Sequence, residues 1–195
     1  GVAYTWYPRP AAPPRPVALT IGAPDGKTLP ATPNFFAISP DGSRVAFTTG
    51  TDDDTELWIR ELGSVAPVKV AGVTDAFQLT WSPDSKSILY ASRSTSNRSG
   101  RSIRRFDLAG GPVRTINEEA NSRPTWGRSG VIITEGPDNT LYRVAETGGS
   151  LVPVLAPDTT RGELDLRWPS FLPDGRHFLF MVRAKGPAIT GIYLG

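Results

Sequence analysis

Few residues in this sequence have the types and spacing that catalysis or metal binding requires. His177 is the only histidine and there is no cysteine, so a serine triad and a site of several histidine or thiolate ligands are both hard to build. No Gly-x-Ser-x-Gly motif is present to raise a serine nucleophile on a sharp turn. We therefore expect His177 to be structural, and we expect no catalytic residue, no metal and no cofactor.

One acidic cluster has oxygen ligands for a hard cation. Residues 51–56 read Thr-Asp-Asp-Asp-Thr-Glu, and closely spaced carboxylates can bind Ca²⁺. The cluster lacks the Asp-x-Asp-x-Asp-Gly order of a helix-loop calcium site, which favours a solvated loop between two strands. Both interpretations of this loop stay open at the level of sequence.

The charge balance argues against a nucleic-acid partner. The chain has 21 basic and 19 acidic residues, and its densest group of arginines (Arg98, Arg101, Arg104 and Arg105) surrounds a serine-rich loop that we expect to be solvated. The absence of cysteine fits cytoplasm and periplasm alike. No apolar run approaches the roughly 20 residues of a membrane-spanning helix, and the first residues lack the features of a signal peptide.

One motif occurs four times and organises the predicted fold. In each copy a large apolar residue precedes a turn, and a short apolar run follows it. The turns read Ser-Pro-Asp-Gly at 39–42, Ser-Pro-Asp-Ser at 82–85, Gly-Arg-Ser-Gly at 127–130 and Leu-Pro-Asp-Gly at 172–175. The apolar anchors, 43, 45 and 45 residues apart, are Ile38, Trp81, Trp126 and Phe171.

The turn residues have a conformational role. Proline presets φ at an early turn position, aspartate accepts local backbone N–H bonds, and glycine takes the positive φ that lets the next strand return. We expect Asp41, Asp84 and Asp174 to form hairpin turns rather than to act chemically.

A period of 40–45 residues with four strands per unit predicts an all-β protein, a β-propeller of about four four-stranded blades. The blade repeats lie near 34–72, 77–118, 122–156 and 167–195. The fourth repeat lacks an outer strand, which the strand-like run 17–22 could supply by closing the ring. Alternatively, the chain is part of a larger ring, completed by a longer parent chain or by a second copy in a homo-oligomer.

Residues just before each innermost strand are expected at one face of the ring, near its central channel. This position holds aromatic, amide and guanidinium groups that suit a peptide or an anionic ligand. Packing of blade against blade is the alternative role for the same side chains. The candidate ligand-binding residues are Asn34, Gln78, Arg123, Arg167 and Trp168.

Residues 1–16 differ from the rest of the chain. An apolar, aromatic start is followed by five prolines within nine positions, which favours a semi-rigid polyproline linker. Aromatic residues followed by arginines also fit the exit from a membrane span upstream of residue 1. A plain tether and a juxtamembrane segment are both consistent with this composition.

The repeated turn, followed by two apolar residues and an aromatic one, resembles the TolB-like, WD-repeat-like β-propellers of bacteria. The resemblance covers roughly residues 17–195 and is clearest at 38–47, 81–90 and 171–180. It is weakest at 126–133, where the Pro-Asp turn is missing. It implies a non-catalytic module that binds a protein or peptide.

Three sequence segments, at 108–112, 141–144 and 167–179, are similar to a narrower group of propellers. They resemble the propellers that follow a membrane span in bacterial, eukaryotic-like serine/threonine protein kinases. This resemblance implies an extracytoplasmic sensor or scaffold, periplasmic or on the cell surface. No kinase motif is present, so any kinase activity would belong to other parts of a parent protein.

Two alternatives share the Ser-Pro-Asp repeats. One is the propeller of a prolyl-oligopeptidase-like peptidase, whose catalytic domain is absent from this sequence. The other is a TolB-type periplasmic assembly protein. A self-standing lyase or hydrolase would need several convergent ionisable groups, which a single histidine makes difficult.

Overall fold

The computed structural model describes residues 18, 20–24, 26–30, 35–51, 54–93 and 100–195, without the side chains of Asp54 and Ser122. These residues form fifteen strands and one short 3-10 helix, η1 (Thr159–Arg161). All strand pairs are antiparallel. Among the described elements, no helix is long and apolar enough to cross a membrane.

The strands make four sheets, each built from strands consecutive in sequence. The first sheet contains β1 (Phe36–Ile38), β2 (Arg44–Thr51), β3 (Asp54–Glu61) and β4 (Val68–Thr74). The second contains β5 (Phe77–Trp81), β6 (Ser87–Arg93), β7 (Arg101–Asp107) and β8 (Arg114–Asn117). The third contains β9 (Ser122–Trp126), β10 (Val131–Glu135), β11 (Leu141–Ala145) and β12 (Val152–Leu155). The fourth contains β13 (Glu163–Phe171), β14 (Phe178–Ala184) and β15 (Gly191–Leu194).

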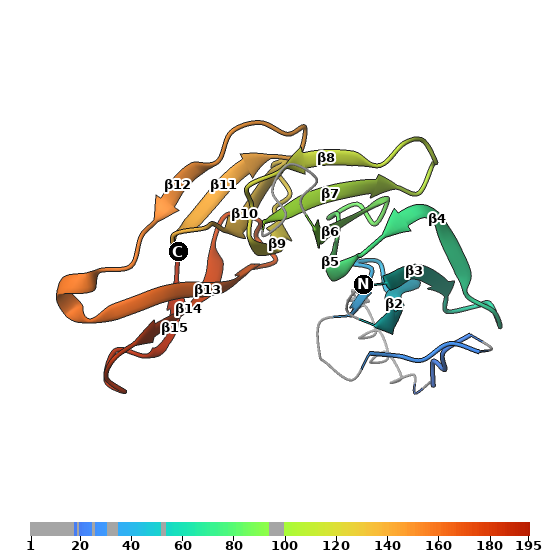
Figure 1. The fold of residues 1–195 in the computed structure, drawn as a ribbon, viewed down its shortest axis with the longest axis horizontal. Coiled ribbons are helices and arrows are strands. Elements are labelled where there is room, and N and C mark those ends of the chain that lie inside the picture. The colour runs from blue at the N-terminus through green and yellow to red at the C-terminus, as the bar shows by residue number, and fades with distance from the viewer. Residues whose placement is uncertain (1–17, 19, 25, 31–34, 52–53, 94–99) are drawn as a thin grey trace, which may run out of the picture.

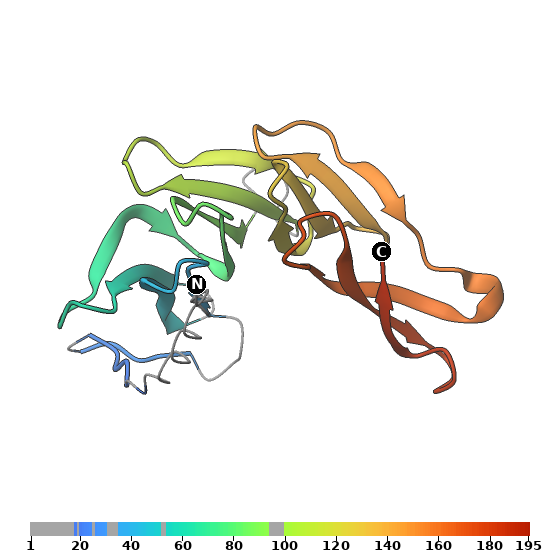
Figure 2. The ribbon, with the colours of Figure 1, turned by 180° about the vertical axis from the view of Figure 1, so that it is seen from behind.

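The four sheets follow one another as the blades of an open arc, with the first and fourth sheets at opposite ends (Figure 1). The reverse view shows the same opening between the two end sheets (Figure 2). The innermost strands β1, β5, β9 and β13 contact one another in sequence order. This arrangement confirms the predicted all-β propeller of four repeats, with three strands in the last.

The hydrophobic core is divided among the interfaces between blades. One cluster joins Ala46 and Leu57 of the first sheet to Trp81 and Ile88 of the second. Two further clusters join the second sheet to the third and the third to the fourth. Each sheet is therefore stabilised mainly by burying one face against its sequence neighbour.

The predicted turn chemistry is present. Ser39 Oγ (2.6 Å) and the Ser43 amide (2.9 Å) donate to the Asp41 carboxylate. The Asp84 and Asp174 carboxylates accept equivalent bonds in the second and fourth blades. The turn position with positive φ is held by Gly42, Ser85, Gly130 and Gly175. These aspartates therefore close hairpins, as expected.

The four anchors occupy equivalent places, each at the end of an innermost strand. Trp81 and Trp126 are buried, and Phe171 is partly buried against the third cluster. Ile38 is 61% exposed, so this anchor, unlike the other three, does not pack into the described core. The reason is positional: the other three anchors pack against the preceding blade, whereas no described sheet precedes β1.

The described residues of the predicted closing strand, 18 and 20–22, do not close the ring. The described residues of 17–22 form no strand, and the Thr20 carbonyl accepts a hydrogen bond from Arg60 Nη1 of β3 at 3.3 Å. This segment therefore lies beside the first sheet and not at the open edge of the fourth. The predicted linker, residues 1–16, lies outside the described residues. The fourth blade begins at Glu163, four residues before the predicted boundary.

Candidate functional site

Three residues of the predicted binding surface share an uncommon backbone conformation. Gln78, Arg123 and Trp168 have φ values of 52°, 53° and 55°. Each sits where the pairing of its innermost strand with the next strand shifts register, which identifies a β-bulge. Left-handed φ is costly for residues with a Cβ, and this strained bulge occurs once in each of the second, third and fourth blades.

These bulges connect neighbouring blades. The Arg123 amide donates to Gln78 Oε1 at 2.9 Å, and the Trp168 amide donates to Glu135 Oε1 at 2.9 Å. At Arg123 and Trp168 the freed backbone N–H is therefore satisfied by a side chain of the preceding blade. Gln78 accordingly has the blade-packing role that was the alternative to ligand binding.

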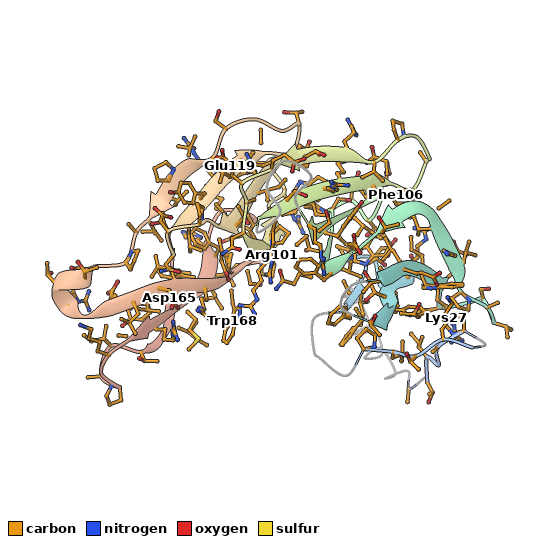
Figure 3. The ribbon with its side chains drawn as sticks, viewed as in Figure 1. Lys27, Arg101, Phe106, Glu119, Asp165 and Trp168 are labelled. Atoms are coloured by element: carbon orange, nitrogen blue, oxygen red, sulfur yellow. The ribbon has the colours of Figure 1, made fainter. Side chains whose placement is uncertain are left out.

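The bulges also shape an open groove of about 460 Å³ on the inner strands. Trp168 points to the concave side of the arc (Figure 3). Three of the five candidate residues, Gln78, Arg123 and Trp168, line this groove. The remaining lining residues are Phe36, Leu79, Thr80, Pro124, Thr125, Pro169 and Ser170.

Arg123 is the charged centre of the groove. Its guanidinium carbon lies 5.1 Å from the centroid of the Trp168 ring, a cation–π contact. Nη1 forms an ion pair with Glu135 Oε1 at 3.6 Å, a separation too long for a hydrogen bond. Nε is buried and has no hydrogen-bond partner in the described part of the chain. The guanidinium is thus held by the Trp168 ring and the Glu135 ion pair, and its terminal N–H groups donate no hydrogen bond to any described residue.

Seven groove residues were not among the predicted candidates. They lie one or two positions before an anchor, whereas the sequence reasoning selected positions three and four before it. The alternation of side chains along a strand could have indicated some of them, because every second residue shares a face. The bulges change that alternation, so the sequence could not specify the full lining.

Two candidates do not contribute to the groove. Arg167 Nε lies 2.7 Å from Asp165 Oδ1, and Arg183 also pairs with the buried Asp165 carboxylate. Arg167 is therefore engaged within its own blade and is not among the lining residues. Asn34 lies outside the described residues.

A second groove, of about 420 Å³, separates the outer strands of the first and second blades. Its charged side chains are already paired. Arg44 Nη2 is 3.3 Å from Glu61 Oε1, and Lys69 Nζ is 2.6 Å from Glu56 Oε1. The inner groove is the better candidate because Arg123 keeps donors that no described residue uses.

His177 closes a turn. Its Nδ1 lies 2.6 Å from Asp174 Oδ2, and both side chains are exposed. The His177 hydrogen bond and the backbone N–H groups of Arg176 and His177 hold the pKa of Asp174 well below its ordinary value. Among the described residues, no three acidic, histidine or cysteine side chains come close enough to hold a metal ion.

The acidic loop contributes one carboxylate to an ion-pair cluster. Glu56 pairs with Lys69 and, at 3.0 Å, with Lys27. Hydrogen bonds from these two lysines lower the pKa of Glu56 to about 2. Asp52 and Asp53 lie outside the described residues, so calcium binding by this loop stays a prediction.

Comparison with known proteins identifies the fold. No family model and no curated protein matches this sequence. The chain is similar to a solved structure described as a putative TolB from Agrobacterium tumefaciens, with 19% identity and a TM-score of 0.60, covering 84% of this chain and 58% of the other. It is also similar to TolB from Acinetobacter baumannii, with 17% identity and a TM-score of 0.57, covering 83% and 43%.

A third similar structure is the β-propeller domain of the Trilobed protease from Pyrococcus furiosus, described as having an open velcro topology. It has 18% identity and a TM-score of 0.59, and the match covers 82% of this chain and 54% of the other. The chain thus spans about half the length of these structures. Their architecture and the four consecutive antiparallel sheets show that this chain has the β-propeller fold.

Proposed function

We propose that this chain is a non-catalytic binding module that captures a segment of a protein or peptide in the groove around Arg123 and Trp168. The proposal rests on the contacts that the Arg123 guanidinium makes and on the hydrogen bonds that it does not make. The guanidinium is held by the Trp168 ring and by the ion pair with Glu135, and it donates no hydrogen bond to any described residue. A ligand that accepts from its terminal N–H groups would gain charge-assisted hydrogen bonds.

The groove walls suit an extended peptide. Phe36, Leu79, Pro124, Pro169 and Trp168 supply apolar surface. Threonine and serine hydroxyls lie between them, at Thr80, Thr125 and Ser170. Apolar walls with a few fixed polar groups are typical of ligand sites, and aromatic and arginine side chains dominate binding energy at interfaces. A carboxylate or a main-chain carbonyl would meet Arg123.

The cellular setting is part of the same proposal. The sequence segments at 108–112, 141–144 and 167–179 support an extracytoplasmic sensor or scaffold, tethered to the membrane and joined to a serine/threonine kinase. A regulatory propeller of a peptidase is the second candidate, favoured by similarity to the acylaminoacyl peptidase of Pyrococcus horikoshii (14% identity, TM-score 0.53, covering 82% of this chain and 30% of the other). The complete reading frame distinguishes a kinase domain upstream from a hydrolase domain downstream.

The binding proposal is tested with a peptide library displayed on phage and selected against the purified chain. Selected peptides are synthesised and their dissociation constants measured by calorimetry. Arg123→Ala should weaken binding by about tenfold or more, because a hydrogen bond to a charged group contributes about 1.5–3 kcal/mol. Trp168→Ala should weaken binding as well, because it removes both the stacking surface and the support of Arg123.

Arg143→Ala is the matched control, because Arg143 is an exposed arginine of β11 that does not line the groove. It should leave the dissociation constant and the melting temperature unchanged. The proposal fails if no peptide is selected, or if the selected peptides bind the Arg123→Ala and Trp168→Ala variants as tightly as the original chain.

A further inference from the structure

A buried carboxylate contacts both residues on which the proposed function depends. Glu135 of β10 is 8% exposed and is not among the residues that line the groove. Its Oε1 accepts a hydrogen bond from the Trp168 amide at 2.9 Å and pairs with Arg123 Nη1 at 3.6 Å. A single carboxylate oxygen therefore contacts the backbone of the stacked ring and the cation that stacks on it.

The bond to the bulge amide does not require a charged side chain. At the junction of the second and third blades, the equivalent amide is that of Arg123, and it donates to the neutral Gln78 Oε1 at 2.9 Å. The counterparts of Glu135, three residues after the partner of each anchor, are uncharged in the other blades: Thr48, Ala91 and Met181. The charge of Glu135 therefore has a role other than accepting this bond.

A second stacked arginine shows how the fold holds such a group when its role is structural. Arg105 Cζ lies 4.9 Å from the centroid of the Trp126 ring, and Trp126 Nε1 donates to Glu146 Oε2 at 2.9 Å. Arg105 Nε also donates to Asp107 Oδ1 at 2.6 Å. Arg105 thus uses its donors within the fold, whereas the Arg123 guanidinium meets its carboxylate only at ion-pair distance.

We propose that Glu135 determines which class of ligand the groove accepts. By pairing with Arg123 it makes the pair neutral overall, so the groove selects an uncharged acceptor, a main-chain carbonyl or a side-chain amide of a peptide, over a carboxylate. This inference rests on the proposed function, because it concerns the same groove.

The physical reason is repulsion between like charges. A ligand carboxylate that accepts from Arg123 lies close to the Glu135 carboxylate, and a partly buried site screens this repulsion little. Arg123 is the only charged residue among the described residues that line the groove, so no second cation in the lining offsets the repulsion. A neutral carbonyl accepts from the same N–H groups without this cost. Selectivity often depends on such a repulsive contact against the wrong ligand.

The rest of the lining suits a neutral peptide segment. The hydroxyl groups of Thr80, Thr125 and Ser170 can donate or accept hydrogen bonds and carry no charge. The backbone of an extended peptide presents one donor and one acceptor at each residue other than proline. The groove therefore offers an uncharged peptide partners of both kinds.

The test compares peptides selected from one phage library on the original chain and on Glu135→Gln. Glutamine keeps an oxygen for the Trp168 amide and removes the charge, so the melting temperature should change little. Peptides selected on the original chain should contain few Asp and Glu residues, and those selected on Glu135→Gln should be enriched in them. In calorimetry, the acidic peptides should bind Glu135→Gln at least about tenfold more tightly than the original chain.

Glu146→Gln is the matched control, because it removes a carboxylate beside the other stacked arginine and does not touch the groove lining. It should leave the selected peptides and their dissociation constants unchanged. The double variant Arg123→Ala/Glu135→Gln retains neither charge of the pair. Acidic peptides should therefore lose the affinity that Glu135→Gln alone gives them.

The outcomes separate this inference from the proposed function. Acidic peptides selected on the original chain and weakened by Arg123→Ala would overturn the inference and leave the proposed function standing. Equal affinity of acidic peptides for the original chain and Glu135→Gln would overturn it as well, as would a large fall in the melting temperature of Glu135→Gln, which would assign the charge to stability. If neither selection yields a peptide whose binding depends on Arg123, the proposed function fails and the inference with it.

Discussion

At the scale of single residues, burial at the anchor position depends on the neighbouring blade more than on residue type. Trp81 is buried between two sheets and donates its Nε1–H to the first blade. Ile38, at the equivalent strand end, contacts no preceding sheet among the described residues. The same place in the repeat therefore carries very different amounts of stabilisation, which the two substitutions below compare.

Trp81→Ala should lower the free energy of unfolding by about 3–5 kcal/mol, because it removes a large buried ring from the junction of two blades. Trp81→Phe should cost less, since it keeps most of the buried surface and loses the bond to the Ala37 carbonyl. Ile38→Ala should change the free energy by less than about 0.5 kcal/mol. Urea unfolding of the purified chain and its variants measures all three. Equal costs for Trp81→Ala and Ile38→Ala would contradict the assigned burial.

At the scale of elements, the turns of the hairpins depend on ionised aspartates. The Ser39 hydroxyl and the amide and hydroxyl of Ser43 lower the pKa of Asp41 to about 2, against an ordinary value of 3.8. The pKa of Asp84 is lowered mainly by the Ser82 hydroxyl. Because folding lowers these pKa values, the carboxylates stabilise the fold at pH values above about 4 and lose that contribution as the pH falls toward 2.

Asp41→Asn should therefore reduce stability at neutral pH and have progressively less effect as the pH falls from 4 to 2. The physical reason is that the original carboxylate becomes neutral over this interval and then resembles the amide. Urea midpoints of the two proteins, measured from pH 7 to pH 2, should converge at the acid end. A difference that stays constant with pH would show that the charge of Asp41 does not contribute.

The bulged innermost strand is a second element whose conformation depends on the preceding blade. A left-handed residue in each of β5, β9 and β13 frees one amide, and a side chain of the preceding blade accepts from it at β9 and β13. The strain is compensated by contacts between blades, so the bulge exists only where blades adjoin. This dependence explains why the groove, with Arg123 over Trp168, forms at the junctions and not on a single sheet.

At the scale of the whole molecule, the main contacts of each blade among the described residues are with its sequence neighbours, as in other repeat proteins. The second and third blades have core clusters on both faces, whereas the fourth shares one cluster with the third. Stability should therefore decrease from the middle of the arc toward its ends.

Hydrogen exchange monitored by mass spectrometry should show this gradient in the purified chain. Amides of β14 and β15 should exchange faster than those of β6 and β10, because the end blade opens without disturbing two interfaces. Uniform exchange along the arc would indicate that all four blades unfold only together.

The repeat, the strand order and the hairpin turns could be derived from the sequence because they are local. Proline, aspartate and glycine restrict a few neighbouring dihedral angles, and a spacing of 43 to 45 residues between anchors specifies one blade per repeat. The equivalent places of Trp81, Trp126 and Phe171 follow from that spacing, and so does the all-β fold.

Only the tertiary structure decided which of these residues are covered and which meet one another. The exposure of Ile38, the pairing of Arg167 with Asp165, and the position of Thr20 beside β3 depend on neighbours distant in sequence. The stacking of Arg123 on Trp168 likewise requires two blades, from repeats 45 residues apart, to lie side by side. Local sequence patterns specify the strands and turns of a blade, whereas side-chain burial and pairing depend on contacts between blades.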